Sequence, residues 1–151
     1  MKPVPKSYAF LDQAPQIHES CFIAANATVI GDVSIGENSS VWYQCVLRGD
    51  INRIVIGSNT NIQDGTVVHL ADKFGTTVGD WVTVGHKALL HACTIEDEVL
   101  IGMAAIVMDG AVIGKRSIVG HPRNGHPAGI PCDGLARKSE TNTCRRRTIR
   151  P

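Results

Sequence analysis

The sequence predicts an all-β chain, a single-stranded parallel β-helix of hexapeptide repeats with a triangular cross-section. Two observations predict it: small aliphatic residues recur every six positions, and Gly, Asn or Asp often follows them. A six-residue unit of this kind forms one short strand that buries one side chain, and each corner between strands needs a permissive backbone. Three such units therefore make one coil with three faces.

The repeat is a series of inward-facing aliphatic positions. Its members are Ile23, Val29, Ile35, Val41, Leu47, Ile56, Ile62, Val68, Val78, Val84, Leu90, Ile95, Ile101, Val107, Ile113 and Val119. The spacing departs from six only after Leu47, after Val68 and after Leu90. Counting the positions in threes places these three residues on one face of consecutive coils.

Two of the inward-facing residues on that face are each followed by a histidine. His69 comes after Val68 and His91 comes after Leu90, so that with Arg48 they form one column along the coil axis. Neighbouring parallel strands lie about 4.8 Å apart, and two imidazoles at that separation can reach one metal ion with bonds of about 2.0–2.1 Å. We therefore expect His69 and His91 to be a metal-binding pair.

A third histidine, His86, lies on another face. Ile62 and Val84 share that face, which stacks Asp64 beneath His86 and places His86 around a corner from the pair. A six-residue face is roughly 15–20 Å wide, so His86 cannot join the pair within one chain. It can join only across a subunit boundary. The sequence thus predicts a homotrimer in which each site takes two histidines from one subunit and one from its neighbour.

Four separate motifs stand in register with the hexapeptide count. They are Arg48-Gly49-Asp50, Asn61-Ile62-Gln63-Asp64-Gly65, His69, and Gly85-His86-Lys87-Ala88-Leu89-Leu90-His91. With these motifs, residues 17–120 resemble the short bacterial branch of the γ-class carbonic anhydrase family. The resemblance implies that the β-helix is left-handed and trimeric, and that the three histidines bind zinc or iron. Histidine ligands suit cobalt as well.

The resemblance also implies an activity, the hydration of carbon dioxide to bicarbonate by a metal-bound hydroxide at the trimer interfaces. A zinc ion held by three neutral imidazoles lowers the pKa of a bound water from 15.7 to about 7, so hydroxide is available at neutral pH. Gln63, by the same resemblance, hydrogen-bonds and orients this water, whereas its alternative role is a corner amide bonded to the next coil.

The remaining candidate site residues surround the histidines. Arg48 and Asp64 lie on columns that meet only between subunits, so we hypothesise that they form an ion pair that locks the trimer. Asp50 is a second partner for Arg48, because a planar guanidinium can take two carboxylates at once. Asn61 fits a corner turn as well as it fits the site.

One departure from the family keeps two alternatives open. The founding member has acidic residues on two loops that carry protons away, but here Ile51 follows Asp50 and residues 70–77 contain no glutamate. Asp72 and His18 are the nearest titratable candidates for that task. The first alternative is a non-catalytic metal-binding or assembly β-helix protein. The second is a hexapeptide acyltransferase, a class that uses one histidine as its general base.

Composition restricts the class of protein and its partners. The 151 residues are 43% hydrophobic and 19% charged with a net charge of +1, which fits one globular domain and favours neither a nucleic acid nor an anionic membrane as partner. With no apolar run of roughly 18 residues and no export signal at residues 1–10, we expect a cytoplasmic protein whose partner is its small-molecule substrate. Five cysteines without CxxC spacing argue against disulfides. We expect Cys93 to be a buried filler.

The repeat stops after Gly120, so we interpret residues 1–120 as a β-helix metal-binding domain and residues 121–151 as an atypical tail. Two interpretations of the tail stay open. It is rich in Pro and Arg and fits a disordered basic segment. It also fits the product of a frameshift, because codons shifted by one nucleotide permit a peptide that resembles the normal end of this family. We assign no metal role to His121 or His126.

Overall fold

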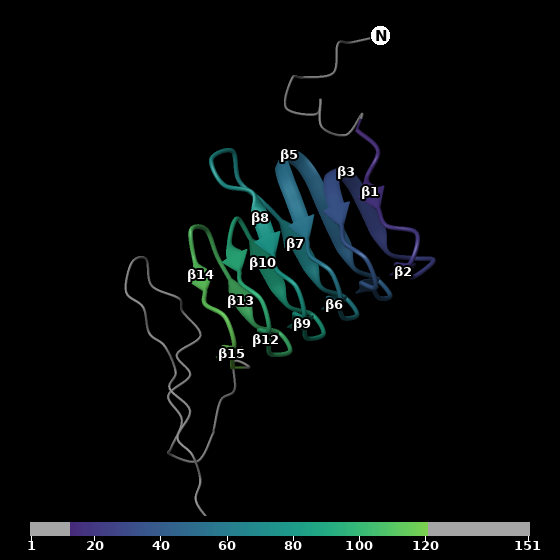
Figure 1. Cartoon of the computed structure of the whole chain (residues 1–151). Helices are drawn as coiled ribbons and strands as arrows, with labels where there is room; N and C mark the ends of the chain where they lie inside the picture. Colours follow the sequence, from purple (N-terminus) through teal and green to yellow (C-terminus); the bar gives the residue numbers. More distant parts are fainter. Residues whose placement is uncertain (1–12, 121–151) are drawn as a thin grey trace, which may run out of the picture.

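The structure is a computed structural model that describes residues 13–120, and these form a solenoid of stacked coils (Figure 1). All of its hydrogen-bonded strand pairs within that range are parallel. None of the described residues belongs to a helix, and so none lies in a helix that could span a membrane. The tail interpreted above, residues 121–151, lies outside the described residues.

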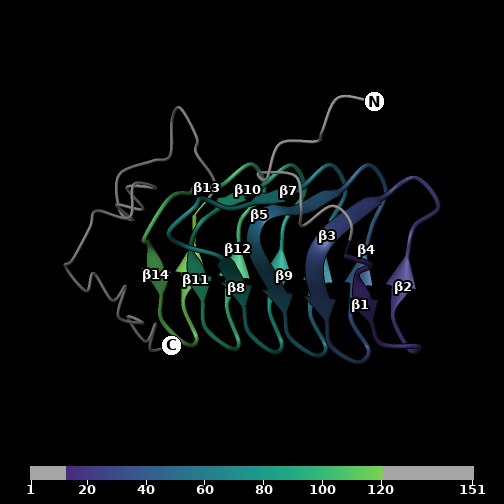
Figure 2. The ribbon, with the colours of Figure 1, turned by 90° about the horizontal axis from the view of Figure 1, so that it is seen from above.

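The strands lie on three faces, which Figure 2 shows from above as a stack of coils. Face 1 consists of the first parts of β3 (Thr28–Ile35) and β5 (Val46–Ile56), with β7 (Val67–His69), β10 (Leu89–His91) and β13 (Ile106–Val107). Face 2 consists of β1 (Gln16–Ile17), the last parts of β3 and β5, β8 (Thr76–Val78), β11 (Thr94–Ile95) and β14 (Val112–Ile113). Face 3 consists of β2 (Phe22–Ile23), β4 (Ser40–Val41), β6 (Asn61–Ile62), β9 (Thr83–Val84), β12 (Leu100–Ile101) and β15 (Ile118–Val119).

The predicted inward positions form the core. Leu47, Val68 and Leu90 pair in register on face 1, and each is fully buried. The positions nearest the two ends of the solenoid are partly buried and pack against that core; they are Ile23, Val29, Ile113 and Val119. The prediction of a parallel β-helix built from hexapeptides is confirmed. The handedness of the coil and the homotrimer stay predictions.

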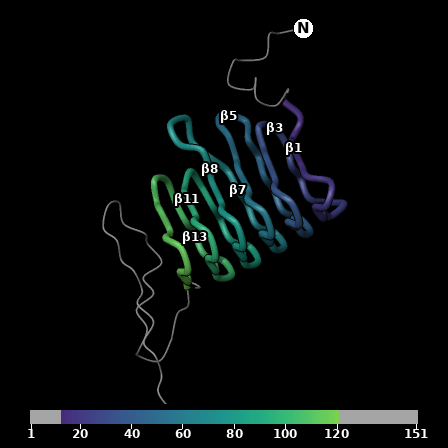
Figure 3. The backbone as a smooth tube through the Cα atoms, viewed as in Figure 1, coloured from purple at the N-terminus to yellow at the C-terminus, as the bar shows by residue number. Residues whose placement is uncertain are grey.

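Two strands are longer than the repeat predicts. β3 and β5 continue around the corner between faces 1 and 2, which the smooth tube of Figure 3 shows as broad bends. Gly31 has a φ of 80° in the first bend. In the second, a Cβ on Gly49 would lie 2.5 Å from the carbonyl oxygen of Asp32. All three departures from six-residue spacing fall at this corner between faces 1 and 2. We call it the irregular corner; it consists of residues 48–53, 69–75 and 91–93.

The regular corners differ from the expectation that Gly, Asn or Asp would occupy them. Trp81, Lys87 and Ala104 have φ values of 58°, 58° and 56°, in the left-handed region. In each case the neighbouring coil accepts a hydrogen bond: the amides of Trp81, Lys87 and Ala104 donate to the carbonyls of Ser58, Asp64 and His86 respectively. Because a left-handed residue costs roughly 1–2 kcal/mol and such a bond returns about 1 kcal/mol, other residue types are tolerated.

We expect Ala104→Gly to raise the free energy of unfolding by about 0.5–1 kcal/mol, because relief of the left-handed strain exceeds the extra entropy lost by glycine. Denaturant unfolding at fixed protein concentration measures it. The control is Ala105→Gly. Ala105 is 2% exposed and does not have a positive φ, so loss of its buried methyl group should lower the free energy of unfolding. Equal losses in both variants would contradict the strain argument.

Candidate metal centre

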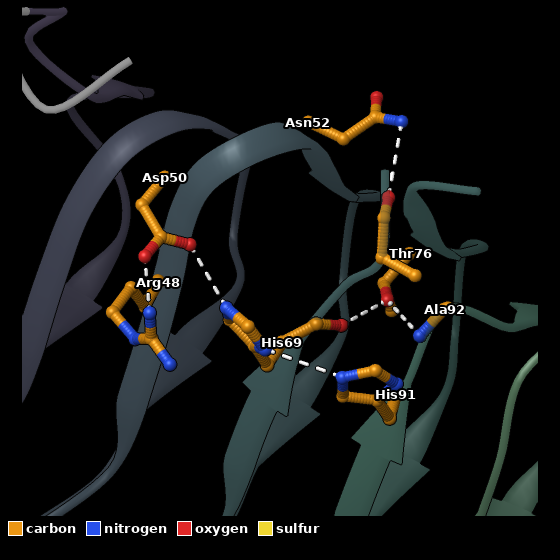
Figure 4. A network of polar contacts seen from close by, with 8 residues as sticks. Arg48, Asp50, Asn52, His69, Thr76, His91 and Ala92 are labelled. Carbon is orange, nitrogen blue, oxygen red and sulfur yellow. Dashed lines mark hydrogen bonds and ion pairs between the residues drawn. The ribbon is translucent and has the colours of Figure 1, made fainter. Parts of the chain in front are cut away.

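Face 1 ends in two adjacent imidazoles. His69 closes β7 and His91 closes β10, and the two residues pair in register, as the column count predicts. Their rings lie with centroids 5.2 Å apart and planes tilted by 51°. Figure 4 shows Nδ1 of His69 pointing at Nε2 of His91, at a distance of 3.2 Å. The side chains are 16% and 26% exposed, so solvent and small molecules reach this edge of the coil.

Each imidazole also has a carboxylate partner on its other ring nitrogen. Nε2 of His69 lies 2.8 Å from Oδ1 of Asp50, and Nδ1 of His91 lies 2.6 Å from Oδ1 of Asp109. A carboxylate accepts a hydrogen bond, which assigns the ring proton to the nitrogen that faces it. The two nitrogens that face one another, Nδ1 of His69 and Nε2 of His91, are therefore both acceptors when the rings are neutral.

Two facing acceptors 3.2 Å apart fit a shared cation. Two ligands bound to one tetrahedral zinc ion at about 2.05 Å lie roughly 3.3 Å from each other, which matches the observed separation. The repulsion between the lone pairs of His69 and His91 is removed when an ion lies between them. Imidazole ligands suit zinc, iron and cobalt alike, so these two nitrogens could be ligands of any of the three metals.

Asp50 is the buried member of this network. It is 4% exposed, and its carboxylate contacts both the imidazole of His69 and the guanidinium of Arg48. Burial by itself would raise the pKa of Asp50, but the hydrogen bonds from His69 and Arg48 outweigh it and hold the pKa below its usual value. Asp50 is therefore ionised at neutral pH. The predicted contact between Arg48 and Asp50 is present.

Thr76 fixes the backbone on which the two histidines stand. Its side chain is fully buried. Its hydroxyl donates a hydrogen bond to the carbonyl of His69 and accepts one from the amide of Ala92 at 2.9 Å. The Ala92 amide also lies 3.2 Å from the His69 carbonyl. Figure 4 shows this hydroxyl between the two histidine-bearing segments. Thr76 thus ties the coil of His69 to the coil of His91, and sequence reasoning did not find it.

His86 lies in the turn after β9 of face 3, one residue beyond Gly85, and is not part of the pair. Its Nδ1 lies 3.0 Å from Oδ2 of Asp64, the residue that the column count places beneath it. The two side chains are 45% and 43% exposed. Within residues 13–120 of a single chain, no three His, Cys, Asp or Glu side chains converge so as to hold a metal ion.

The other site candidates on face 3 have structural contacts. Asn61 lies in β6 and its amide donates to the Ser40 hydroxyl at 2.8 Å, so the corner-turn interpretation is wrong: its side chain bridges two strands of one face. Gln63 follows β6, and its carbonyl accepts the Thr66 amide and the Cys45 thiol. These are contacts of the Gln63 main chain, and its side chain stays a candidate through its position next to Asp64.

Asp109 is the functional candidate that sequence reasoning missed. The signal was present, because Val107 pairs with Leu90 and the residue two positions later reaches the His91 column. Asp50 and Asp109 are the acidic residues that contact the pair among the residues described here, whereas Asp72 and His18 have no recorded contact with it. Cys93 is 2% exposed, and burial raises the pKa of its thiol to about 12, so it is the unreactive filler expected.

The comparisons with known proteins agree with the fold and the motifs. Residues 14–49 match the family described as bacterial transferase hexapeptide (six repeats). The chain is 50% identical over 114 residues to gamma carbonic anhydrase 2, mitochondrial, of Arabidopsis thaliana, a match that covers 72% of this chain and 41% of that one. It is 43% identical over 108 residues to the carbonic anhydrase of Geobacillus kaustophilus, covering 72% and 59%. The chain belongs to the γ-class carbonic anhydrase family.

Members of the γ-class carbonic anhydrase family share their scaffold with proteins of other names. A solved structure of a hexapeptide transferase family protein from Anaplasma phagocytophilum is 40% identical, with a TM-score of 0.52 over 69% of this chain and 68% of that one. The chain spans about half the length of the curated relatives it matches. Family membership therefore supports carbon dioxide hydration and a metal cofactor at the level of the family.

Proposed function

We propose that this chain forms a homotrimer that hydrates carbon dioxide to bicarbonate at a metal ion held by three histidines. His69 and His91 come from one subunit and His86 from its neighbour. The observation that supports this most is the pair of acceptor nitrogens that face each other at 3.2 Å, in a chain of the γ-class carbonic anhydrase family. Because one chain offers two of the three ligands at that point, the site needs a second copy.

The outer surface of face 1 supports this assembly. Beside the histidine column runs a second column of apolar side chains, in register from coil to coil: Val46, Val67, Leu89 and Ile106. Val67 is 37% and Ile106 is 52% exposed. A continuous apolar strip on a flat sheet face gains free energy when another protein surface covers it. Its position next to His69 and His91 suits an interface that also brings in His86.

The side chains of the site divide the chemistry among them. A bound zinc or iron ion would supply a nucleophile at neutral pH by acidifying water. His69 and His91 present acceptor nitrogens because Asp50 and Asp109 take the protons of the other ring nitrogens. Leu89 lies on the same side of β10 as His91 and offers an apolar wall to an uncharged gas. We further propose that Gln63 orients the attacking water across the subunit boundary.

The test is stopped-flow carbon dioxide hydration on protein purified without oxygen, with metal content and molar mass measured on the same sample. We expect a trimer whose hydration rate scales with about one metal ion per subunit and vanishes in His91→Ala. A metal-loaded trimer without hydration above the free metal would move the function to a non-catalytic metal-binding protein. Loading with zinc, iron and cobalt in turn identifies the metal that supports the highest rate.

Acyl transfer is a second candidate, because the matched family description and a solved relative both carry the word transferase. That class needs one histidine base rather than three ligands. An acetyl coenzyme A assay with a panel of amine and hydroxyl acceptors tests it on the same preparation. Turnover that persists after metal removal would favour this candidate over carbon dioxide hydration.

A further inference from the structure

The turn that holds Asp109 is built against the backbone of the histidine pair. The Ala111 amide donates to the Met108 carbonyl at 3.1 Å and closes a four-residue turn. Within it, the Gly110 amide donates to the carbonyl of Ala92 at 2.8 Å, which anchors the turn to the residue after His91. Gly110 has a φ of 72°, a conformation that suits glycine. Two contacts, one backbone and one side chain, thus join Asp109 and its turn to the His91 segment.

The Asp109 contact repeats a pattern seen at the other two histidines. Asp50 hydrogen-bonds one ring nitrogen of His69, as Asp109 hydrogen-bonds Nδ1 of His91, and Asp64 lies within ion-pair distance of one ring nitrogen of His86. A carboxylate in this position fixes the tautomer and the ring orientation of a metal-binding imidazole and makes the other nitrogen a better donor to a metal. Without Asp109, His91 is free to carry its proton on Nε2, the nitrogen that faces His69.

We infer that Asp109 is a positioning residue that fixes His91 in the tautomer with the proton on Nδ1, so that Nε2 can bind the metal. Asp109 acts through His91 and does not itself bind the ion. This inference rests on the proposed function for the presence of a metal, but not for the reaction that follows. Each of the three histidines thus has a carboxylate in contact with it. Two of these, Asp50 and Asp64, lie in the sequence motifs, and Asp109 is the third.

The experiment uses the full-length protein and two readouts. Zinc affinity is measured by competition with a chromophoric chelator, and we expect Asp109→Ala to weaken it 10- to 100-fold, about the usual cost of removing such a partner. The side-chain ¹⁵N spectrum of metal-free protein, well above the imidazole pKa of about 6.5, reports the tautomer. We expect His91 to carry its proton on Nδ1 in the wild type and to move toward Nε2 in Asp109→Ala.

Two further variants separate positioning from general structure. Asp109→Asn keeps an oxygen that accepts the Nδ1 proton, so it should retain the wild-type tautomer and lose less affinity than Asp109→Ala. Glu98→Gln is the matched control, because Glu98 is 49% exposed, close to the 45% of Asp109, and pairs with Arg116 away from the histidines. It should leave zinc affinity and the His91 tautomer unchanged.

The outcomes distinguish this inference from the proposed function. Wild-type zinc affinity in Asp109→Ala, or a wild-type His91 with its proton on Nε2, would overturn the role of Asp109; the second result needs no variant to fold. Wild-type protein that binds zinc at the three histidines without hydrating carbon dioxide would overturn the proposed reaction and leave the role of Asp109 standing.

Discussion

Mixtures of His86→Ala and His91→Ala subunits are expected to regain about one quarter of the wild-type metal sites and hydration rate, although neither variant alone forms a complete site. A complete site needs a subunit that keeps His69 and His91 beside one that keeps His86. In a random mixture of equal amounts, each of the two subunits that flank a site is the required variant with a chance of about one half. Both are therefore correct at about one site in four.

The measurement is metal content and stopped-flow rate after the two variants are unfolded together and refolded. The matched control mixes His69→Ala with His91→Ala. These two ligands stand in register on neighbouring coils of one chain, so no arrangement of such subunits joins an intact pair, and we expect no recovery. Recovery in the control, or none in the test mixture, would contradict a site shared between subunits.

Arg48→Glu is the second substitution with a large expected effect. It places a new carboxylate against Asp50, which is 4% exposed and also contacts His69. A buried charge that loses its partner costs roughly 3–5 kcal/mol. The 43% exposure of the Arg48 side chain reduces this, so we expect a loss of about 3 kcal/mol in the free energy of unfolding and about a 100-fold loss of zinc affinity. Denaturant unfolding and chelator competition measure the two effects.

Arg53→Glu provides the comparison, because Arg53 lies in the same strand, β5, and pairs with Asp32. Its side chain is 65% exposed, and the loss of such a surface pair costs at most about 1 kcal/mol. Sedimentation of both variants also tests the hypothesis that Arg48 pairs with Asp64 of a neighbouring subunit, since only Arg48→Glu should then dissociate the trimer. Similar behaviour of the two variants would contradict a special role for Arg48.

The columns of side chains on the solenoid could be predicted from the sequence because its period is fixed. Val68 pairs with Leu90 because each coil adds one strand in register to the last. The same arithmetic placed His69 beside His91 and Asp64 beneath His86 before any contact was known. The inward-facing strand positions hold Val, Ile or Leu in coil after coil, so the repeat can be found by counting along the sequence.

Other contacts at the site were beyond that counting. The count places Thr76 at the start of β8 on face 2 and the turn of Asp109 next to the His91 column, but it does not show that the two side chains reach the histidine segments. The left-handed φ of Lys87 and Trp81 could not be predicted from the sequence either, because it depends on a hydrogen bond to a neighbouring coil. Such contacts depend on the path of the backbone in three dimensions.

The sequence by itself determined the parallel solenoid, its inward-facing residues and the alignment of His69 with His91, since a regular repeat converts spacing directly into position. Only the tertiary structure decided how the imidazoles are oriented. Asp50 and Asp109 each hold one ring nitrogen, and the two remaining acceptor nitrogens lie 3.2 Å apart. That orientation results from hydrogen bonds between side chains on different coils, and their directions follow from side-chain torsions and corner geometry rather than from sequence spacing.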